Sequence, residues 1–288
     1  MNGSSRSIAI KKNIIASLFL KGISILVSLQ VVPLTINYIN PTRYGIWLTL
    51  SSIVAWLSYF DLGFAHGFRN RFAEAVAKGD MQLAREYVST TYVVLSLLFS
   101  SVFLIAIVVN HFVDWSAILN VDAAYSSELN IVFGILAFFF CLNIVASIFT
   151  TMLTANQKPA LASLIQTLGQ VFGFICIYIL TKTVPGNLDV LAFAFSGVPC
   201  FLLIIISIGM FLSGRYRHLS PSFHFVHFSL TKKIVGLGGQ FFIIMISMLF
   251  VFQLINIVIS RVAGPMAVTQ YNIAYKYFNV LVLSLIHI

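Results

Sequence analysis

The chain has 288 residues, of which 59% are hydrophobic and only 9% are charged. Its mean hydropathy of +0.98 lies far above that of a water-soluble globular domain. This composition excludes a disordered chain, a collagen-like repeat and a soluble enzyme. The formal net charge of +9 could suggest a nucleic-acid partner, but the basic residues do not gather in one stretch, and we expect no nucleic acid.

Seven stretches of the sequence contain no Asp, Glu, Lys or Arg. Each has about the length that a helix needs to cross a membrane, or more. They are residues 22–42, 44–60, 87–113, 129–157, 159–181, 190–214 and 234–260. A hydrocarbon core about 30 Å thick takes roughly 20 helical residues, whereas barrel strands are roughly half as long and alternate in polarity. Since helices satisfy their own backbone hydrogen bonds in lipid, the sequence predicts an all-α polytopic membrane protein.

We expect about eight transmembrane helices in chain order, at about 13–36, 44–65, 88–110, 129–153, 160–181, 190–213, 235–259 and 269–288. The first follows a basic lead and has no convincing cleavage site, so we interpret it as a retained span. The connection 66–87 interleaves apolar and charged residues, which predicts an amphipathic helix pair broken at Gly79-Asp80. Segment 221–228 alternates aromatic and polar residues and is expected to lie along the headgroups.

The basic residues divide unequally between the two sides of this arrangement. One side carries 12 of them, namely Arg6, Lys11, Lys12, Arg69, Arg71, Lys78, Arg85, Lys158, Arg215, Arg217, Lys232 and Lys233. The other side has only 3, Arg43, Lys182 and Arg261, and Lys21 and Lys276 fall inside spans. By the positive-inside rule, the richer side, with the N-terminus, is predicted to be cytoplasmic.

The two ends of the chain share a pattern of a lysine pair, an apolar span, a short turn and a tyrosine motif. It starts at Lys11-Lys12 and again at Lys232-Lys233. Both copies begin on the same side, which indicates a parallel repeat of six spans, as in two-lobed transporters. We therefore predict a six-helix N-terminal lobe at 1–214 and the start of a second lobe at 215–288. The chain stops inside an apolar run, so we expect it to be C-terminally truncated.

Several short motifs carry a family resemblance over nearly the whole chain. They are Tyr44-Gly45-Ile46-Trp47, Phe60-Asp61-Leu62-Gly63, Arg69-Asn70-Arg71, Ala77-Lys78-Gly79-Asp80, the glycine-rich 236–242, Gln253 to Asn256, and Tyr271 to Tyr275. In these motifs the chain resembles the polysaccharide biosynthesis and O-antigen flippases of the multidrug/oligosaccharidyl-lipid/polysaccharide exporter superfamily. The motifs are packing and loop patterns rather than catalytic signatures.

The resemblance implies two lobes with about twelve to fourteen helices in all around a V-shaped cavity, working by alternating access. It also implies a bacterial inner-membrane protein that moves an undecaprenyl-pyrophosphate-linked oligosaccharide to the periplasmic leaflet for lipopolysaccharide or other surface polysaccharide. The expected partners are membrane lipid, the lipid-linked oligosaccharide and other polysaccharide-assembly membrane proteins.

Two lysines inside the spans are the first candidate substrate-binding residues. Lys21 lies nine residues after Lys12, about 13 Å further along a helix. A cation inside a span is costly, and it usually faces protein or water. A lipid pyrophosphate needs such charge compensation in a cavity. For both Lys21 and Lys276, the alternative is a side chain that extends to the nearest headgroups.

Four amide side chains form a second candidate group: Gln166 and Gln170 on one helical face, and Gln253 and Asn256 on another. All four could bind sugar hydroxyls, or they could hydrogen bond between helices. Asp61 is the one carboxylate placed inside a span, and it is a candidate for ion coupling, for pairing with Arg69 or Arg71, or for capping a turn. Arg69, Arg71 and Arg85 could contact an acidic lipid or act only as topology determinants.

Other classes of function remain as alternatives. A cation-coupled multidrug exporter of the same superfamily would be expected to use membrane-embedded carboxylates, which are scarce here. A polysaccharide polymerase or ligase would call for Arg, His or acidic groups on a large outer loop, and the outer connection 111–128 has no Arg or Lys. A non-transporting membrane scaffold is the third alternative. The three cysteines lie in apolar stretches, and we expect no catalytic residue, metal or cofactor.

Overall fold

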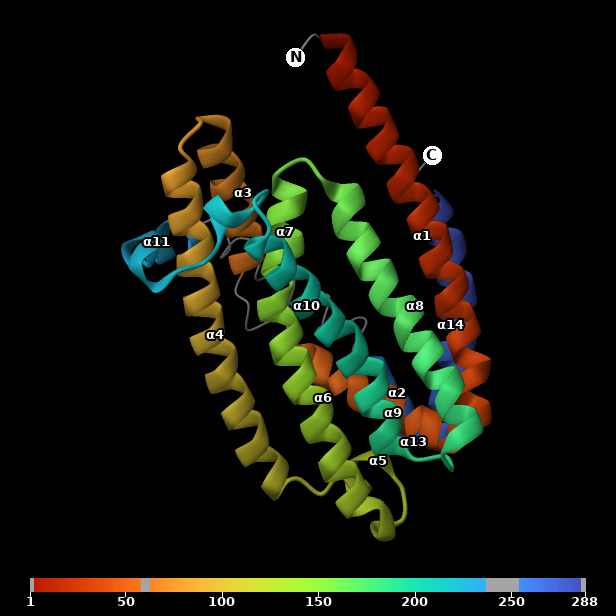
Figure 1. Cartoon of the computed structure of the whole chain (residues 1–288). Coiled ribbons are helices and arrows are strands. Elements are labelled where there is room, and N and C mark those ends of the chain that lie inside the picture. The colour runs from red at the N-terminus through yellow and green to blue at the C-terminus, as the bar shows by residue number, and fades with distance from the viewer. Residues whose placement is uncertain (1–2, 58–62, 237–253, 286–288) are drawn as a thin grey trace.

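The computed structural model describes residues 3–57, 63–236 and 254–285, and every regular element in these ranges is helical (Figure 1). Five helical segments are long and apolar enough to cross a membrane: Ile15–Ile39, Met81–Phe112, Ala123–Ala155, Pro159–Thr183 and Leu188–Leu212. Together with further apolar helices they form an all-α polytopic membrane protein, as predicted. The expected second, seventh and eighth spans include residues 58–62, 237–253 and 286–288, which lie outside the described residues.

The helices of the predicted first lobe are α1 (Gly3–Ile39), α2 (Pro41–Ala55), α3 (Phe64–Ala77), α4 (Met81–Phe112), α5 (Trp115–Leu119), η2 (Ala123–Tyr125), α6 (Ser126–Ala146), α7 (Ile148–Ala155), α8 (Pro159–Thr183), α9 (Leu188–Ala192), η3 (Phe193–Gly197) and α10 (Val198–Leu212). The remaining elements are η4 (Arg217–Leu219), η5 (Phe223–Phe225), α11 (Ser229–Val235), α13 (Leu254–Ala263) and α14 (Pro265–Leu285). The predicted boundary at 214 falls in the loop between α10 and η4.

Local chemistry explains where several of these helices begin and end. Asn40, with a positive φ of 73°, separates α1 from α2, and its side chain accepts a hydrogen bond of 3.0 Å from the Arg43 amide. The predicted break in 66–87 occurs between α3 and α4: Gly79 has a φ of +76°, and Asp80 caps α4 by accepting from the Leu83 amide at 2.9 Å. Gly264 makes the corresponding turn between α13 and α14, with a φ of +81°.

Two predicted spans contain interruptions. The span expected at 129–153 is divided at Ser147, whose hydroxyl donates to the Ile144 carbonyl at 2.7 Å. The span expected at 190–213 contains a π-helical turn, η3, which ends two residues before Pro199. Proline has no N–H to donate within a helix, and a single widened turn accommodates this loss.

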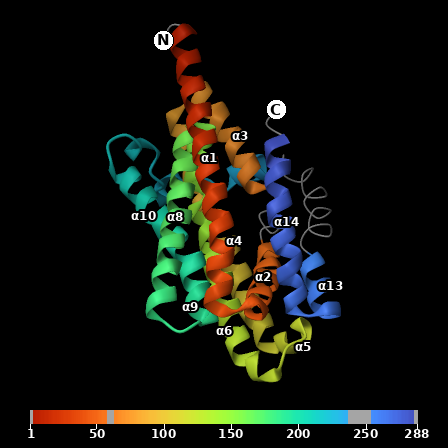
Figure 2. The same cartoon turned by 90° about the vertical axis from the view of Figure 1, so that its right-hand side faces the viewer.

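The bundle has two ends that we name by their short helices. The α3 end holds α3, the α7–α8 turn and α11, and α1 projects from it, whereas the α5 end holds α5, the α1–α2 turn and the α13–α14 turn (Figures 1 and 2). Of the three basic residues of the predicted outer side, Arg43 lies in the first turn of α2, Arg261 in the last turn of α13 and Lys182 in the last turn of α8. All three lie towards the α5 end (Figure 1).

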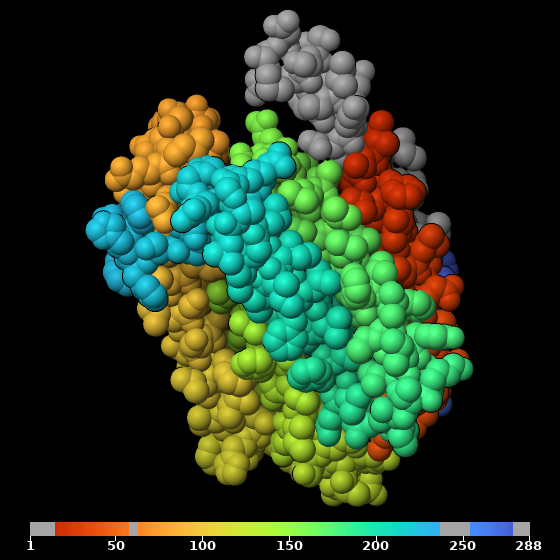
Figure 3. Space-filling view, in the orientation of Figure 1, coloured from red at the N-terminus to blue at the C-terminus, as the bar shows by residue number. Residues whose placement is uncertain are grey.

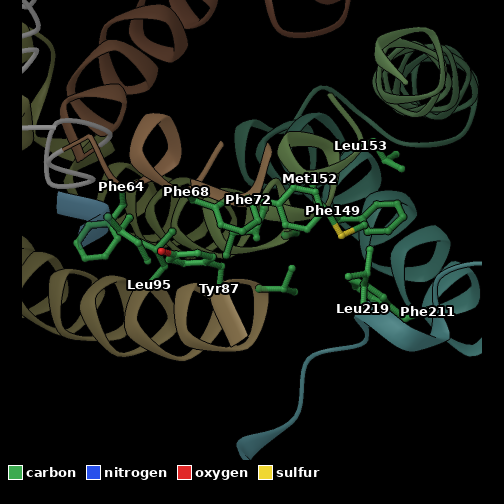
Figure 4. Close-up of a cluster of buried hydrophobic side chains, with 14 of the residues drawn as sticks. Phe64, Phe68, Phe72, Tyr87, Leu95, Phe149, Met152, Leu153, Phe211 and Leu219 are labelled. Carbon is green, nitrogen blue, oxygen red and sulfur yellow. The ribbon is translucent and has the colours of Figure 1, made fainter. Parts of the chain in front are cut away.

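Two apolar cores hold these ends together. At the α3 end, Phe68 and Phe72 of α3 are fully buried against Phe149 and Met152 of α7, with α4 alongside (Figure 4). A second core joins α2, α6 and α9 towards the α5 end. Parts of α4, α8 and α10 lie at the surface in Figure 3. These helices expose large apolar side chains such as Leu104, Ile175 and Ile205, as expected for a lipid-facing surface.

Candidate functional site

A polar cavity of about 430 Å³ lies between α1, α8 and α14. Four of the six residues predicted to bind substrate line it together: Lys21, Gln166, Gln170 and Lys276. The other lining residues are Ser24, Ile25, Ser28, Leu29, Ser163 and Thr167. Residues from the two ends of the sequence thus meet in one space.

The helical repeat explains how α1 and α8 present polar groups to this cavity. On α1, Ser24 and Ser28 follow Lys21 by three and seven residues, which places the three side chains on one face. On α8, Gln166 and Gln170 are four residues apart. The Ser24 hydroxyl donates a hydrogen bond to Oε1 of Gln170, so the two faces contact each other directly. Sequence reasoning missed the serines, although their spacing from Lys21 was visible.

The charge of the cavity is positive. Lys21 is exposed and Lys276 is partly buried, and both ammonium groups belong to lining residues. None of the described lining residues is acidic, and no described carboxylate forms an ion pair with either lysine. Two cations with hydroxyl and amide groups can bind an anionic group and a hydroxyl-rich group in the same space.

A second recess of about 160 Å³ continues from the polar cavity and has an apolar lining. The two spaces share Ser28, Gln170 and Lys276. Beyond these three residues, the recess is lined by Val27, Val31, Gly173, Phe174, Ile177, Phe195 and Pro199. Val31 lies about 12 Å along α1 from Ile39, whereas Lys21 lies about 27 Å from it, so the recess is closer to the α5 end than Lys21 is.

Asn256 lies elsewhere, in a buried contact between α13 and α2. Its amide nitrogen donates to the Ser52 hydroxyl at 2.5 Å, and its carbonyl oxygen accepts from the Asn272 amide at 2.8 Å. The structure does not place Asn256 among the residues that line the cavity. The predicted residues Asp61 and Gln253 lie outside the described residues.

The contact made by Asn256 is one of several that close the α5 end. The Thr269 hydroxyl donates to the Pro41 carbonyl at 2.6 Å, and the Ser260 hydroxyl donates to the Leu119 carbonyl at 2.9 Å. Arg261 also donates to the Ala117 carbonyl. A Cβ atom at Gly45 would lie 1.8 Å from the Pro265 carbonyl oxygen, so α2 and α14 approach more closely than a side chain permits.

The arginines of the α3 end make contacts within the protein. Arg71 pairs with Glu74 at 3.0 Å, and its Nε donates to the Lys233 carbonyl at 3.3 Å. Hydrogen bonds from Lys78 first, and then from Arg71, hold the pKa of Glu74 below its usual value. Arg85 donates to the Ser220 carbonyl at 2.9 Å and lies over the Phe225 ring, whereas Arg69 is exposed.

Comparison with known proteins agrees with this architecture. A family model described as polysaccharide biosynthesis protein matches residues 10–288. The chain belongs to this family. No curated protein sequence matches it.

Among solved structures, this family member is similar to one described as the inward-facing conformation of a multidrug resistance MATE family transporter of the MOP superfamily, with a TM-score of 0.61 and 15% identity. The match covers 84% of this chain and 57% of the transporter, so the chain spans little more than half of that protein's length. The chain thus shares its fold with this transporter over most of its own length.

Proposed function

We propose that this polysaccharide biosynthesis protein takes part in moving an undecaprenyl-pyrophosphate-linked oligosaccharide across the bacterial inner membrane, for O-antigen or a related surface polysaccharide. The observation that carries the proposal is the shared cavity of Lys21 and Lys276, from opposite ends of the chain. Two ammonium groups offset the cost of removing a pyrophosphate from water, and the neighbouring serines and glutamines suit sugar hydroxyls.

The arrangement of the two ends supports movement by alternating access. The α5 end is closed by α13, α14 and α5, while the cavity begins beyond these contacts and includes the exposed Lys21. Opening the α5 end would separate α13 and α14 from α2. With the N-terminus in the cytoplasm, this conformation admits substrate from the cytoplasmic leaflet. Membrane lipid, the lipid-linked sugar and other polysaccharide-assembly membrane proteins are its proposed partners.

The cavity favours an anionic substrate, and this argues against a cation-coupled drug exporter. A cationic drug would meet two ammonium groups, and no described lining residue could neutralise it. The cavity also offers no described pair of groups for acid–base chemistry, so nothing in it favours a polymerase or ligase.

Complementation of a strain that lacks the gene tests the proposal. Lys21→Ala should abolish surface polysaccharide while the protein's membrane abundance stays unchanged, and Lys21→Arg, which keeps the charge, should restore most of it. Lys182→Ala is the matched control, because this exposed lysine lies outside the cavity at the end of α8. Unchanged complementation by Lys21→Ala would contradict the proposed site.

A further inference from the structure

The lining of the recess beside the polar cavity is mostly apolar, unlike the lining that a sugar or a phosphate requires. Its volume is about 160 Å³, and apart from Ser28, Gln170 and Lys276 it is lined by apolar residues. An engineered, enclosed apolar cavity of about 150 Å³ binds a ligand the size of benzene, which shows what a space of this volume can hold. An apolar group of this size would therefore gain free energy by leaving water for the recess.

Two local features create the recess. Gly173 contributes no side chain on α8, where a Cβ atom would lie 3.6 Å from Cγ of Pro199. The π-helical turn η3 carries Phe195, four residues before Pro199, and both residues line the recess. The space thus results from residue choices on two separate helices of the predicted first lobe.

The positive charge at the rim of the recess indicates which chemical group of a ligand lies next to the apolar group that fills the recess. Lys276, Ser28 and Gln170 line both spaces, so a cation and two hydrogen-bonding groups stand where the polar cavity meets the recess. A ligand that uses both spaces carries its anionic group directly beside a small apolar group. In a prenyl pyrophosphate, the first five-carbon unit is bonded directly to the phosphate, whereas apolar substituents of a sugar are separated from the phosphate by the ring.

We infer that the recess binds the first isoprene unit of a prenyl pyrophosphate whose phosphates lie at Lys276. The inference rests on the proposed function and adds to it a site for the carrier lipid next to the site for its head group. It also limits how much of the prenyl chain the recess can hold, because the recess has room for about one isoprene unit. Further units must lie outside it.

Calorimetric titration of the purified protein with methyl pyrophosphate and isopentenyl pyrophosphate tests the inference. Both probes are water-soluble and have the same charged group, so they differ only in carrying one carbon or five. Isopentenyl pyrophosphate should bind at least about tenfold more tightly, because each buried methylene is worth about fourfold in affinity. Geranyl pyrophosphate carries a second isoprene unit, and the recess should contribute no more to its affinity than to that of isopentenyl pyrophosphate.

Two variants fill the recess from different helices, so that the test does not depend on one of them folding. Gly173→Leu on α8 and Val27→Phe on α1 should each bring the two affinities to within about twofold of each other and leave methyl pyrophosphate binding unchanged. Gly209→Leu is the control, because a Cβ atom there meets no atom within 4 Å. It should keep the wild-type preference.

The outcomes separate this inference from the proposed function. Equal binding of the two probes by the wild-type protein, or a preference that survives both filled variants, would overturn the recess as a prenyl site and leave the anionic site intact. Failure of the wild-type protein to bind either probe would contradict the proposed function together with the inference.

Discussion

Asn256 on α13 donates a hydrogen bond of 2.5 Å to the hydroxyl of Ser52 on α2, although the two residues are 204 positions apart in the sequence. Asn272 on α14 donates to the same asparagine, so one buried amide joins three helices. The pair connects the predicted first lobe to the segment predicted to begin the second. These hydrogen bonds can form and break without exposing a large apolar surface, which suits a contact that opens during transport.

Asn256→Ala should therefore weaken the closed α5 end by about 1 kcal/mol, because Ser52 and Asn272 each retain another hydrogen bond to a backbone carbonyl. Electron spin resonance distances between labels at Lys182 and Met266 should show a larger population of long separations. Thr183→Ala is the control, because among the described residues its hydroxyl bonds to the Ile179 carbonyl of its own helix and to no other helix. Identical distance distributions in the two variants would argue against a gating role for Asn256.

Gly45→Ala should lower the thermal midpoint of unfolding by several degrees, because the added Cβ atom would lie 1.8 Å from the Pro265 carbonyl oxygen and force α2 and α14 apart. Gly22→Ala provides the matched comparison. A Cβ atom at Gly22 meets nothing within 4 Å, and alanine favours a helix interior over glycine by about 1 kcal/mol. The second variant should be at least as stable as the wild type, as measured by thermal unfolding in detergent. The opposite order would contradict this packing.

Lys276→Glu should abolish polysaccharide export, because the rim of the recess would then carry the same charge sign as the substrate. Lys276→Arg should retain most of the activity, because the positive charge is kept. Surface polysaccharide per unit of membrane protein is the measurement. Export by the glutamate variant at the wild-type rate would remove Lys276 from the path of the substrate.

A reporter fused after Arg217 should remain cytoplasmic, and one fused after Lys182 should be periplasmic. The basis is the excess of basic residues on the α3 end, 12 against 3 on the α5 end. Alkaline phosphatase is active only outside the cytoplasm, so it should be active in the second fusion alone. Phosphatase activity at Arg217 would reverse the orientation.

The sequence predicted the membrane-spanning architecture well, because charge-free length is a strong constraint in lipid. The break between α3 and α4 was also predictable, since Gly79 and Asp80 strongly favour a helix end followed by a helix start. The interruptions at Ser147 and at η3 were not predicted. Each depends on backbone geometry within a uniformly apolar run, where periodicity carries no signal.

Four residues that line the cavity were predicted because they are polar residues inside apolar runs. Such residues are costly in lipid unless they face protein or water. The sequence did not distinguish Gln170 from Asn256. Both are amides inside spans, yet Gln170 lines the cavity and Asn256 joins α13 to α2. That difference depends on how each helix is rotated against its neighbours, which is set by packing partners far away in the sequence.

The π-helical turn at Phe193–Gly197 holds one residue more than a regular helical turn requires. Because each residue of an α-helix advances the direction of the side chains by about 100°, this extra residue sets where every later side chain of α10 points. A deletion of a single residue here would turn Pro199 away from Gly169 and Gly173. The shape of the binding space therefore depends on the number of residues in one turn as much as on their chemistry.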